Sequence, residues 1–314
     1  MTTASAPSRS RALPASLSIL ALACAFATPV FAQDQNPALS VHALKGGAYW
    51  VSGGISNTGF VVGNTGVLAI DAQRSTAGAQ QELYAIAKVS LKPVKQIVLT
   101  HADPDHVGGL PAFPAGATIS AQENVKTIIE ASIADLNGGP VNGPLYAALA
   151  NHLPTNSVGD FQQKVVDGIP MVLIHVAPAH TAADLMVYLP AHKVVYAGDI
   201  LVNNAAFPVI HTGGSSLGWI ATMKTLLELN ADTYVPGHGA IESKDKLRAR
   251  LRDAEQRRAA VKAMVEQNKT LEEVLQALPD TGVDPRFPTF TKTVFLELTR
   301  GYPPSEAVWI GLQH

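Results

Sequence analysis

The most constraining feature of the sequence is the stretch 100–109, in which two histidines and two aspartates fall within the six residues 101–106. It follows an apolar run, residues 95–99, that has the pattern of a buried strand. After it, Gly108 and Gly109 allow the backbone to turn tightly. Ionisable side chains are rarely placed against a buried strand without partners. The stretch therefore favours a metal site over an acidic solvent-exposed loop.

Three later fragments each place one more ligand-type side chain just after a strand-like run. They are His180 after residues 171–176, Asp199 after residues 193–197, and His238 after residues 232–235. Together with the first stretch they supply seven nitrogen and oxygen donors, namely His101, Asp103, Asp105, His106, His180, Asp199 and His238. Such a set, with a central carboxylate, is sufficient for two divalent ions that share a bridge.

The order of these motifs, H-x-D-x-D-H followed by HT, GD and GHG, resembles the metallo-β-lactamase superfamily. Asp71, which ends the strand-like run 67–70, matches a further aspartate of that family. The resemblance covers residues 39–240 as an ordered set, which makes it more specific than any single motif. It implies an α/β (α+β) fold, a four-layer αβ/βα sandwich with the metals at one edge. Asp103 is a departure, because the family usually has histidine there.

This resemblance also implies roles for the individual ligands. Site one would take His101, His180 and Asp103, and site two would take Asp105, His106 and His238, with Asp199 as the bridge. Asp71 would brace the metal loop by hydrogen bonds without binding metal. A hydroxide between the two ions would be the nucleophile, oriented by Asp105. Zinc is the expected metal, and manganese or iron are alternatives because a carboxylate at Asp103 is harder than imidazole.

Three residues are candidates for contact with a small-molecule substrate. Asn57 precedes a strand-like run, where ordinary turn chemistry explains it equally well, and Asn204 and His211 lie in the loop that follows Asp199. We expect that loop to form one wall of the pocket. Residues 137–160, which are rich in glycine and proline, are expected to form an irregular flap opposite it, with residues 146–149 as a candidate helical turn.

The N-terminal residues 1–32 are typical of a secretory signal peptide. Arg9 and Arg11 precede an apolar run at residues 17–27, and residues 30–32 (VFA) form a cleavage site. The apolar run is too short for a transmembrane anchor. A lipoprotein signal at Cys24 fits less well. We therefore expect a periplasmic or secreted protein without a stable membrane anchor.

The composition limits the remaining possibilities. Cys24 is the only cysteine, so the mature chain has no thiolate ligand. The formal net charge is −2 and 15% of the residues are charged, which does not suggest the basic face that nucleic-acid binding needs. A hydrophobic content of 47% supports a sizeable core. Residues 37–314 are expected to form one domain, whose oligomeric state the sequence does not indicate.

These patterns favour a dinuclear-metal hydrolase that acts on an ester, thioester or lactone. A β-lactamase is the alternative within the same class, because β-lactams act where secreted proteins are found. Alternatives of other classes are a di-iron redox protein and a non-catalytic metal-binding protein. The bound metal distinguishes them, because zinc favours a hydrolase, two irons favour redox chemistry and no metal favours a scaffold.

The signal-peptide interpretation predicts cleavage after Ala32, so that the exported protein begins at Gln33. Mass spectrometry of the protein recovered from the periplasm or the medium measures this directly. A mature chain that still begins before Ala15 would contradict the prediction.

Overall fold

A computed structural model of the chain describes residues 1–4, 38–134, 139–211, 213–281 and 288–301. The fold lies within one compact unit, Asn36–His314. The predicted signal peptide falls almost entirely outside the described residues, so both it and the expected domain boundary stay predictions. Among the described residues, no helix combines the length and the apolar character needed to cross a membrane.

The first sheet has seven strands, and its order follows the sequence from β1 to β7. Its strands are β1 (Ser40–Ala43), β2 (Ala48–Ser52), β3 (Thr58–Val62), β4 (Val67–Ile70), β5 (Val94–Val98), β6 (Thr118–Gln122) and β7 (Asn156–Val158). The first four pair antiparallel, and β4 to β7 pair parallel. Parallel pairing requires long crossover connections, which here contain the helices α1 to α4.

The second sheet has five strands in the order β12-β11-β10-β9-β8. Its strands are β8 (Phe161–Val166), β9 (Ile169–Ile174), β10 (Met186–Leu189), β11 (Val194–Tyr196) and β12 (Thr233–Val235). Only β11 and β12 pair parallel, and the connection between them contains α5. The remaining neighbours pair antiparallel.

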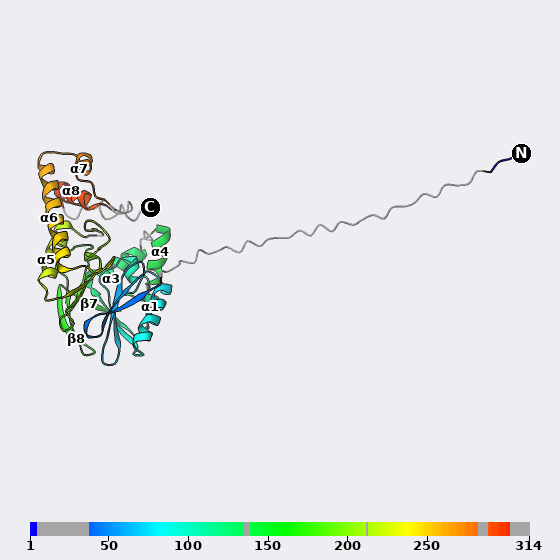
Figure 1. Cartoon of the computed structure of the whole chain (residues 1–314), viewed down its shortest axis with the longest axis horizontal. Helices are drawn as coiled ribbons and strands as arrows, with labels where there is room; N and C mark the ends of the chain where they lie inside the picture. Colours follow the sequence, from blue (N-terminus) through cyan, green and yellow to red (C-terminus); the bar gives the residue numbers. More distant parts are fainter. Residues whose placement is uncertain (5–37, 135–138, 212, 282–287, 302–314) are drawn as a thin grey trace. The chain divides into compact units, whose positions relative to one another are not determined.

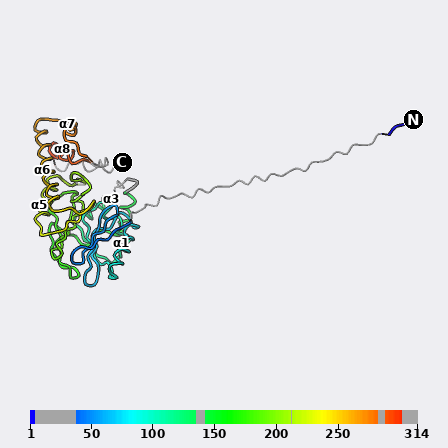
Figure 2. The backbone as a smooth tube through the Cα atoms, viewed as in Figure 1, coloured from blue at the N-terminus to red at the C-terminus, as the bar shows by residue number. Residues whose placement is uncertain are grey.

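The helices and short helical turns complete the described part of the chain. The α-helices are α1 (Thr76–Val89), α2 (Pro104–Val107), α3 (Glu123–Ala134), α4 (Gly139–Ala148), α5 (Ser216–Glu228), α6 (Lys244–Glu266), α7 (Leu271–Ala277) and α8 (Phe290–Arg300). The 3-10 turns are η1 (Lys45–Gly47), η2 (Leu110–Ala112) and η3 (Gly198–Ile200). Figures 1 and 2 show α5 and α6 beside the second sheet, α8 next to α6, and α1 and α3 beside the first sheet.

Three apolar cores separate these elements into layers. Alternate residues of a strand face opposite sides, so on β3 Val61 joins the core between the sheets while Phe60 joins the core under α1 and α3. On the other side, β9 and β10 pack against α5, α6 and α8, with Trp219 and Leu247 in that core. The result is the four-layer αβ/βα sandwich that the sequence predicts, and this prediction is confirmed.

The expected irregular flap at 137–160 contains regular structure instead. Residues 139–148 form α4, and residues 156–158 add β7 to the edge of the first sheet. The side chains of Tyr146 and Leu149 are buried in the same core as α1 and α3. Burial of these two residues stabilises a helix that the local glycine and proline content disfavours.

The long helix α6 supports the loop that follows Asp199. Arg250 donates to the backbone carbonyls of Asn203 (2.7 Å) and Ala205 (2.7 Å) and pairs with Glu242 (2.7 Å). One residue of the same loop, Phe207, also lies under the guanidinium of Arg257, 4.2 Å from the ring centre. The outer helical layer therefore fixes the loop after Asp199, and two later residues of this loop, Val209 and His211, lie at the candidate site.

Glu82 on α1 is a buried carboxylic acid. Its side chain is fully enclosed, and neither oxygen accepts a hydrogen bond within the part of the chain that the structure describes. Burial raises the pKa of Glu82 to about 8, which the neighbouring Thr58 and Gln73 oppose only in part. The folded state thus holds a proton on Glu82 that the unfolded chain releases at a lower pH.

We therefore expect Glu82→Gln to stabilise the protein at alkaline pH. Because the pKa of Glu82 is higher in the folded state, its contribution is most favourable below pH 4.5 and is lost as the pH rises towards 8. At pH 8 the variant should gain on the order of 3 kcal/mol in free energy of unfolding, and at pH 5 much less. Denaturant titrations at both pH values measure the difference, with the exposed Glu130→Gln as control. If the free energy of unfolding depends on pH equally in the variant and the parent, the raised pKa of Glu82 is disproved.

Candidate metal centre

The ligand-rich stretch after β5 folds into a loop and one short helix. Asp103 precedes α2 with an extended backbone, and Pro104 occupies the first helical position, where its missing N–H costs nothing. The single turn of α2 carries Asp105 and brings His106 back towards His101, so that their ring centres lie 4.2 Å apart. The backbone thus gathers donors that would point apart in a continued strand.

One group of three potential ligands consists of His101, Asp103 and His180, the residues expected for site one. The Oδ2 atom of Asp103 lies 3.2 Å from His180 Nε2 and 3.8 Å from His101 Nε2. Both histidines are buried, and the side chain of Asp103 is partly exposed. Three converging donors, two of them buried, are the arrangement that a metal ligand set requires.

A second group consists of Asp105, His106 and His238, the residues expected for site two. The Oδ2 atom of Asp105 lies 3.1 Å from His238 Nε2 and 3.7 Å from His106 Nε2. His238 comes from the loop after β12, in the second sheet, whereas the other two follow β5 of the first. The group therefore joins the ends of both sheets.

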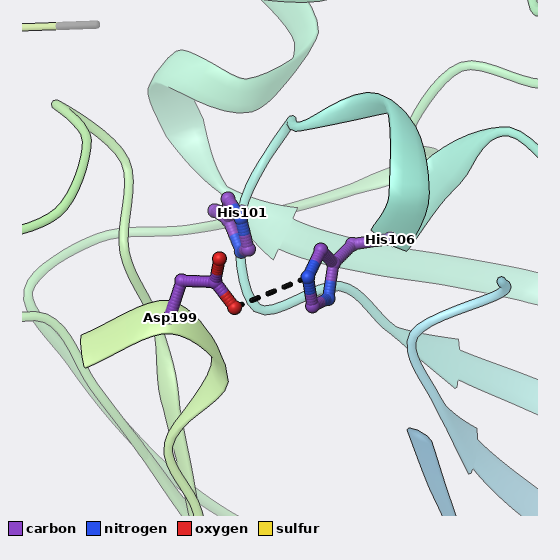
Figure 3. A group of neighbouring side chains, drawn as sticks. All are labelled: His101, His106 and Asp199. Carbon is purple, nitrogen blue, oxygen red and sulfur yellow. Dashed lines mark ion pairs between the residues drawn. The ribbon is translucent and has the colours of Figure 1, made fainter. Parts of the chain in front are cut away.

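Asp199 lies between the two groups. Its Oδ1 atom is 3.2 Å from His106 Nε2, and its Oδ2 atom is 3.6 Å from His180 Nε2 and 3.3 Å from His238 Nε2. Figure 3 shows the carboxylate facing the ring of His106, with the ring of His101 beside both. The carboxylate thus contacts His180 of the first group and both His106 and His238 of the second, which is a position from which it could bridge two ions.

Two glycines allow Asp199 to reach this position. Gly198 has a φ of +52°, in the left-handed region that side chains rarely adopt, and a Cβ there would collide with Thr100. A Cβ at Gly237 would collide with the Asp199 carboxylate itself. Gly198 of the GD motif and Gly237 of the GHG motif therefore allow the two loops that carry Asp199 and His238 to approach each other closely.

Asp71 orients the histidine of α2 in the way expected of it. It accepts hydrogen bonds from the Thr100 backbone (2.7 Å) and hydroxyl (2.8 Å), and its Oδ2 lies 2.9 Å from His106 Nδ1. This contact places the proton of neutral His106 on Nδ1, so that Nε2 carries a lone pair with which it can bind a cation. The Thr100 hydroxyl holds His101 Nδ1 at 2.9 Å in the same manner.

His180 is supported by groups that the sequence patterns do not reveal. Its Nδ1 donates to the Val209 carbonyl at 2.8 Å, which leaves Nε2 directed at the cluster. The buried carboxylate of Asp184 accepts hydrogen bonds from the backbone of Ala179 (3.2 Å) and Thr181 (2.9 Å) and so fixes the turn. The spacing T-A-A-D is a local turn signal that could have identified Asp184, but no local signal indicates Val209.

The donors in the cluster fit a divalent metal. Among the described residues, His101 Nε2, His106 Nε2 and Asp199 Oδ1 are buried without a normal hydrogen-bond partner. Such atoms cost free energy unless a cation or another partner satisfies them. Burial lowers the pKa of His238, but the carboxylates of Asp199 and Asp105 overcome this and raise it to about 10. The carboxylates thus attract positive charge, and a metal would displace protons to take its place.

The three predicted substrate contacts lie in different environments. Asn57 is buried, and its amide donates to the carbonyls of Pro236 (3.0 Å) and Gly239 (2.8 Å), so it supports the loop that carries His238. Asn204 is exposed beside Gly239. His211 lies within the cluster, with its Nδ1 atom 2.7 Å from Asp103 Oδ2. Substrate contact by each of them stays a prediction.

Comparison with known families agrees with this geometry. The profile of the family described as "Metallo-beta-lactamase superfamily" matches residues 51–238, more than half of the chain. The chain therefore belongs to the metallo-β-lactamase superfamily, which confirms the resemblance inferred from its motifs.

Two curated relatives are similar at low identity. The alpha subunit of a 2,4-dinitroanisole O-demethylase from Nocardioides sp. (strain JS1661) is 26% identical over 67% of this chain and 60% of its own length. A linear primary-alkylsulfatase from Pseudomonas sp. (strain ATCC 19151) is 23% identical over 60% of this chain and 42% of its own. The chain thus spans about half the length of these relatives.

Solved structures of other members share the fold. A stereoselective inverting sec-alkylsulfatase from Pseudomonas sp. superposes with a TM-score of 0.63 at 16% identity, covering 86% of this chain and 51% of that one. A metallo-β-lactamase from Pontibacter korlensis gives 0.56 at 20% identity, covering 69% of this chain and 99% of that one. At these identities the likeness concerns the fold.

The position of Asp199 between the two groups predicts that both metals depend on its charge. Asp199→Asn keeps the size of the side chain but removes the anion that holds two cations close together. We expect the variant to bind at least one metal ion fewer than the parent, as measured by elemental analysis after dialysis. Asp160→Asn, at an exposed aspartate, is the control. A variant that retains the metal content of the parent would refute the bridging role.

Proposed function

We propose that this protein is a metal-dependent hydrolase in which two divalent ions, preferably zinc, act on an ester, thioester or lactone. The observation that carries the proposal is the placement of two three-residue ligand groups on either side of Asp199. Divalent ions held there would supply a nucleophile by lowering the pKa of water and would polarise the substrate oxygen. A periplasmic or secreted location is part of this proposal and rests on the N-terminal sequence.

Asp105 is the residue best placed to orient the attacking water. Burial would raise the pKa of Asp105, but His106 and His238 outweigh this and lower it, so the carboxylate stays ionised. The Ser56 hydroxyl donates to the Asp105 backbone carbonyl at 2.5 Å and fixes this part of α2. An ionised, fixed carboxylate can accept a hydrogen bond from water at Oδ2 and direct a lone pair of the water towards the substrate.

The charge of the cluster favours an uncharged substrate. Two divalent ions would be opposed by the carboxylates of Asp103, Asp105 and Asp199, and a hydroxide nucleophile would bring the sum close to zero. A histidine in place of Asp103 would leave about one more positive charge. A carboxylic ester, thioester or lactone therefore fits this cluster better than an anionic sulfate ester does.

A sulfate ester or an aryl methyl ether is the second candidate substrate, and the names of the two curated relatives favour it. Sulfate esters carry a negative charge that needs a cationic partner. Arg74 is a candidate for this role, because its guanidinium donates to Asn142 of α4 at 2.9 Å, and Tyr146 of the same helix donates to the carbonyl of Ala102, next to Asp103, at 3.1 Å. A β-lactam remains a third candidate through the shared fold alone.

Metal analysis followed by a substrate panel tests the proposal. We expect protein purified from its native compartment to contain about two zinc ions per chain and to hydrolyse at least one carboxylic ester, thioester or lactone. A strong chelator should abolish this turnover, and added zinc should restore it. An alkyl sulfate, an aryl methyl ether and a chromogenic β-lactam complete the panel.

Each contrary outcome of the panel has a distinct meaning. Turnover of the sulfate or the ether alone would replace the substrate assignment with the second candidate. Two iron ions with oxygen reduction would replace the hydrolase with a redox protein. Protein that binds no divalent metal would overturn the proposed function.

A further inference from the structure

We propose that His211 is a positioning residue that holds the Asp103 carboxylate in metal site one. The sequence suggests a substrate contact for His211, but the structure directs its Nδ1 atom to Asp103 Oδ2 at 2.7 Å. This is the shortest of the distances from Asp103 Oδ2 to the three histidines around it. The inference rests on the metal centre of the proposed function and assigns a new role within it.

The need for such a residue follows from the length of an aspartate side chain. A carboxylate reaches less far from the backbone than an imidazole does, and its rotation about the Cβ–Cγ bond leaves its oxygens free to face several directions. Asp103 lies at the end of an extended segment just before α2, and none of the described backbone amides donates to its side chain. A donor that hydrogen-bonds to Oδ2 is what would hold this oxygen beside His101 and His180.

His211 is itself held rigidly enough to act in this way. Its ring stacks on that of His180, with centres 5.1 Å apart and planes 20° from parallel. Its backbone amide donates to the His180 carbonyl at 2.5 Å, and its carbonyl accepts from Gly214 at 2.9 Å. An isolated antiparallel bridge between Thr181 and Gly213 extends this pairing. Two short backbone contacts and one ring contact therefore place the imidazole against site one.

The same loop supports a second ligand of site one. The Val209 carbonyl accepts from His180 Nδ1 at 2.8 Å, two residues before His211. Residues 209–211 therefore orient two of the three donors expected for the site, one through the backbone and one through a side chain. The imidazole of His211 also lies next to the additional negative charge that Asp103 brings, which it offsets by donating a hydrogen bond.

Substitution of His211 tests this through metal affinity, without reference to turnover. Zinc titration against a chromogenic chelator should resolve two binding steps in the parent, and His238→Ala identifies the step that belongs to site two. We expect His211→Ala to weaken the site-one step by about 10-fold or more, the usual effect of losing a residue that orients a ligand. The site-two step and the melting temperature of the metal-free protein should change little.

A conservative variant separates the hydrogen bond from the bulk of the ring. The amide nitrogen of asparagine stands as many bonds from Cβ as the Nδ1 atom of histidine does, whereas the amide of glutamine stands one bond further. His211→Asn should therefore keep most of the site-one affinity, and His211→Gln should lose it. His42→Ala is the matched control, because His42 is also stacked on an aromatic ring, that of Trp50, on the exposed strand β1.

A double-mutant cycle then tests whether His211 acts through Asp103. In an Asp103→His background there is no carboxylate to hold, so His211→Ala should weaken site one by less than about 3-fold. An equal loss in both backgrounds would overturn the proposal, because His211 would then act independently of Asp103. Unchanged affinity in His211→Ala alone would also overturn it. If the parent binds no zinc at all, the proposed function itself fails, which is a different result from either.

Discussion

The carboxylate of Asp71 connects the ends of two parallel strands to the helix that carries His106. It follows β4, receives two hydrogen bonds from Thr100 after β5, and contacts His106 Nδ1. Its backbone has a φ of +64°, a conformation that costs free energy and that aspartate tolerates better than most residues. The cost is offset by three contacts in a buried setting. Without this carboxylate, the tautomer of His106 would not be fixed, and α2 would lose its contact with the end of β4 through the His106 ring.

The clustering of the candidate ligands was predictable from the sequence because each of them follows a strand. His180, Asp199 and His238 each come shortly after an apolar run, and strand ends that meet at one edge of a sandwich bring such residues together. Strand alternation and helical periodicity identify individual elements and their buried faces, whereas the four-layer order was predictable only through the resemblance of the ordered motifs to a known family. The signal for each single element lies within a few residues of the position that it predicts.

The contacts that the sequence did not reveal depend on loops whose paths are set elsewhere. The Val209 carbonyl and the His211 ring reach the cluster because the loop after Asp199 is held at two places. Arg250 of α6 holds its first part, and the His180 carbonyl holds its last part. Asn57 has its amide committed to backbone carbonyls at distant positions, which no local pattern can indicate. The sequence indicated only a helical turn around residues 146–149, and the full extent of α4 was missed because its stability comes from the burial of Tyr146 in the core, against its own propensity.

The division of the ligands between two sheets has a consequence for the order of events in folding. Four ligands follow β5 of the first sheet, and the remaining three follow strands of the second. Until the sheets have packed, the unfolded chain offers only fragments of a site, so the folded chain binds metal far more tightly than the unfolded chain does. The choice of metal is then made in the compartment where the chain completes its folding. Once bound, the ions would join the sheets at this edge, and loss of metal would make it the first part of the sandwich to open.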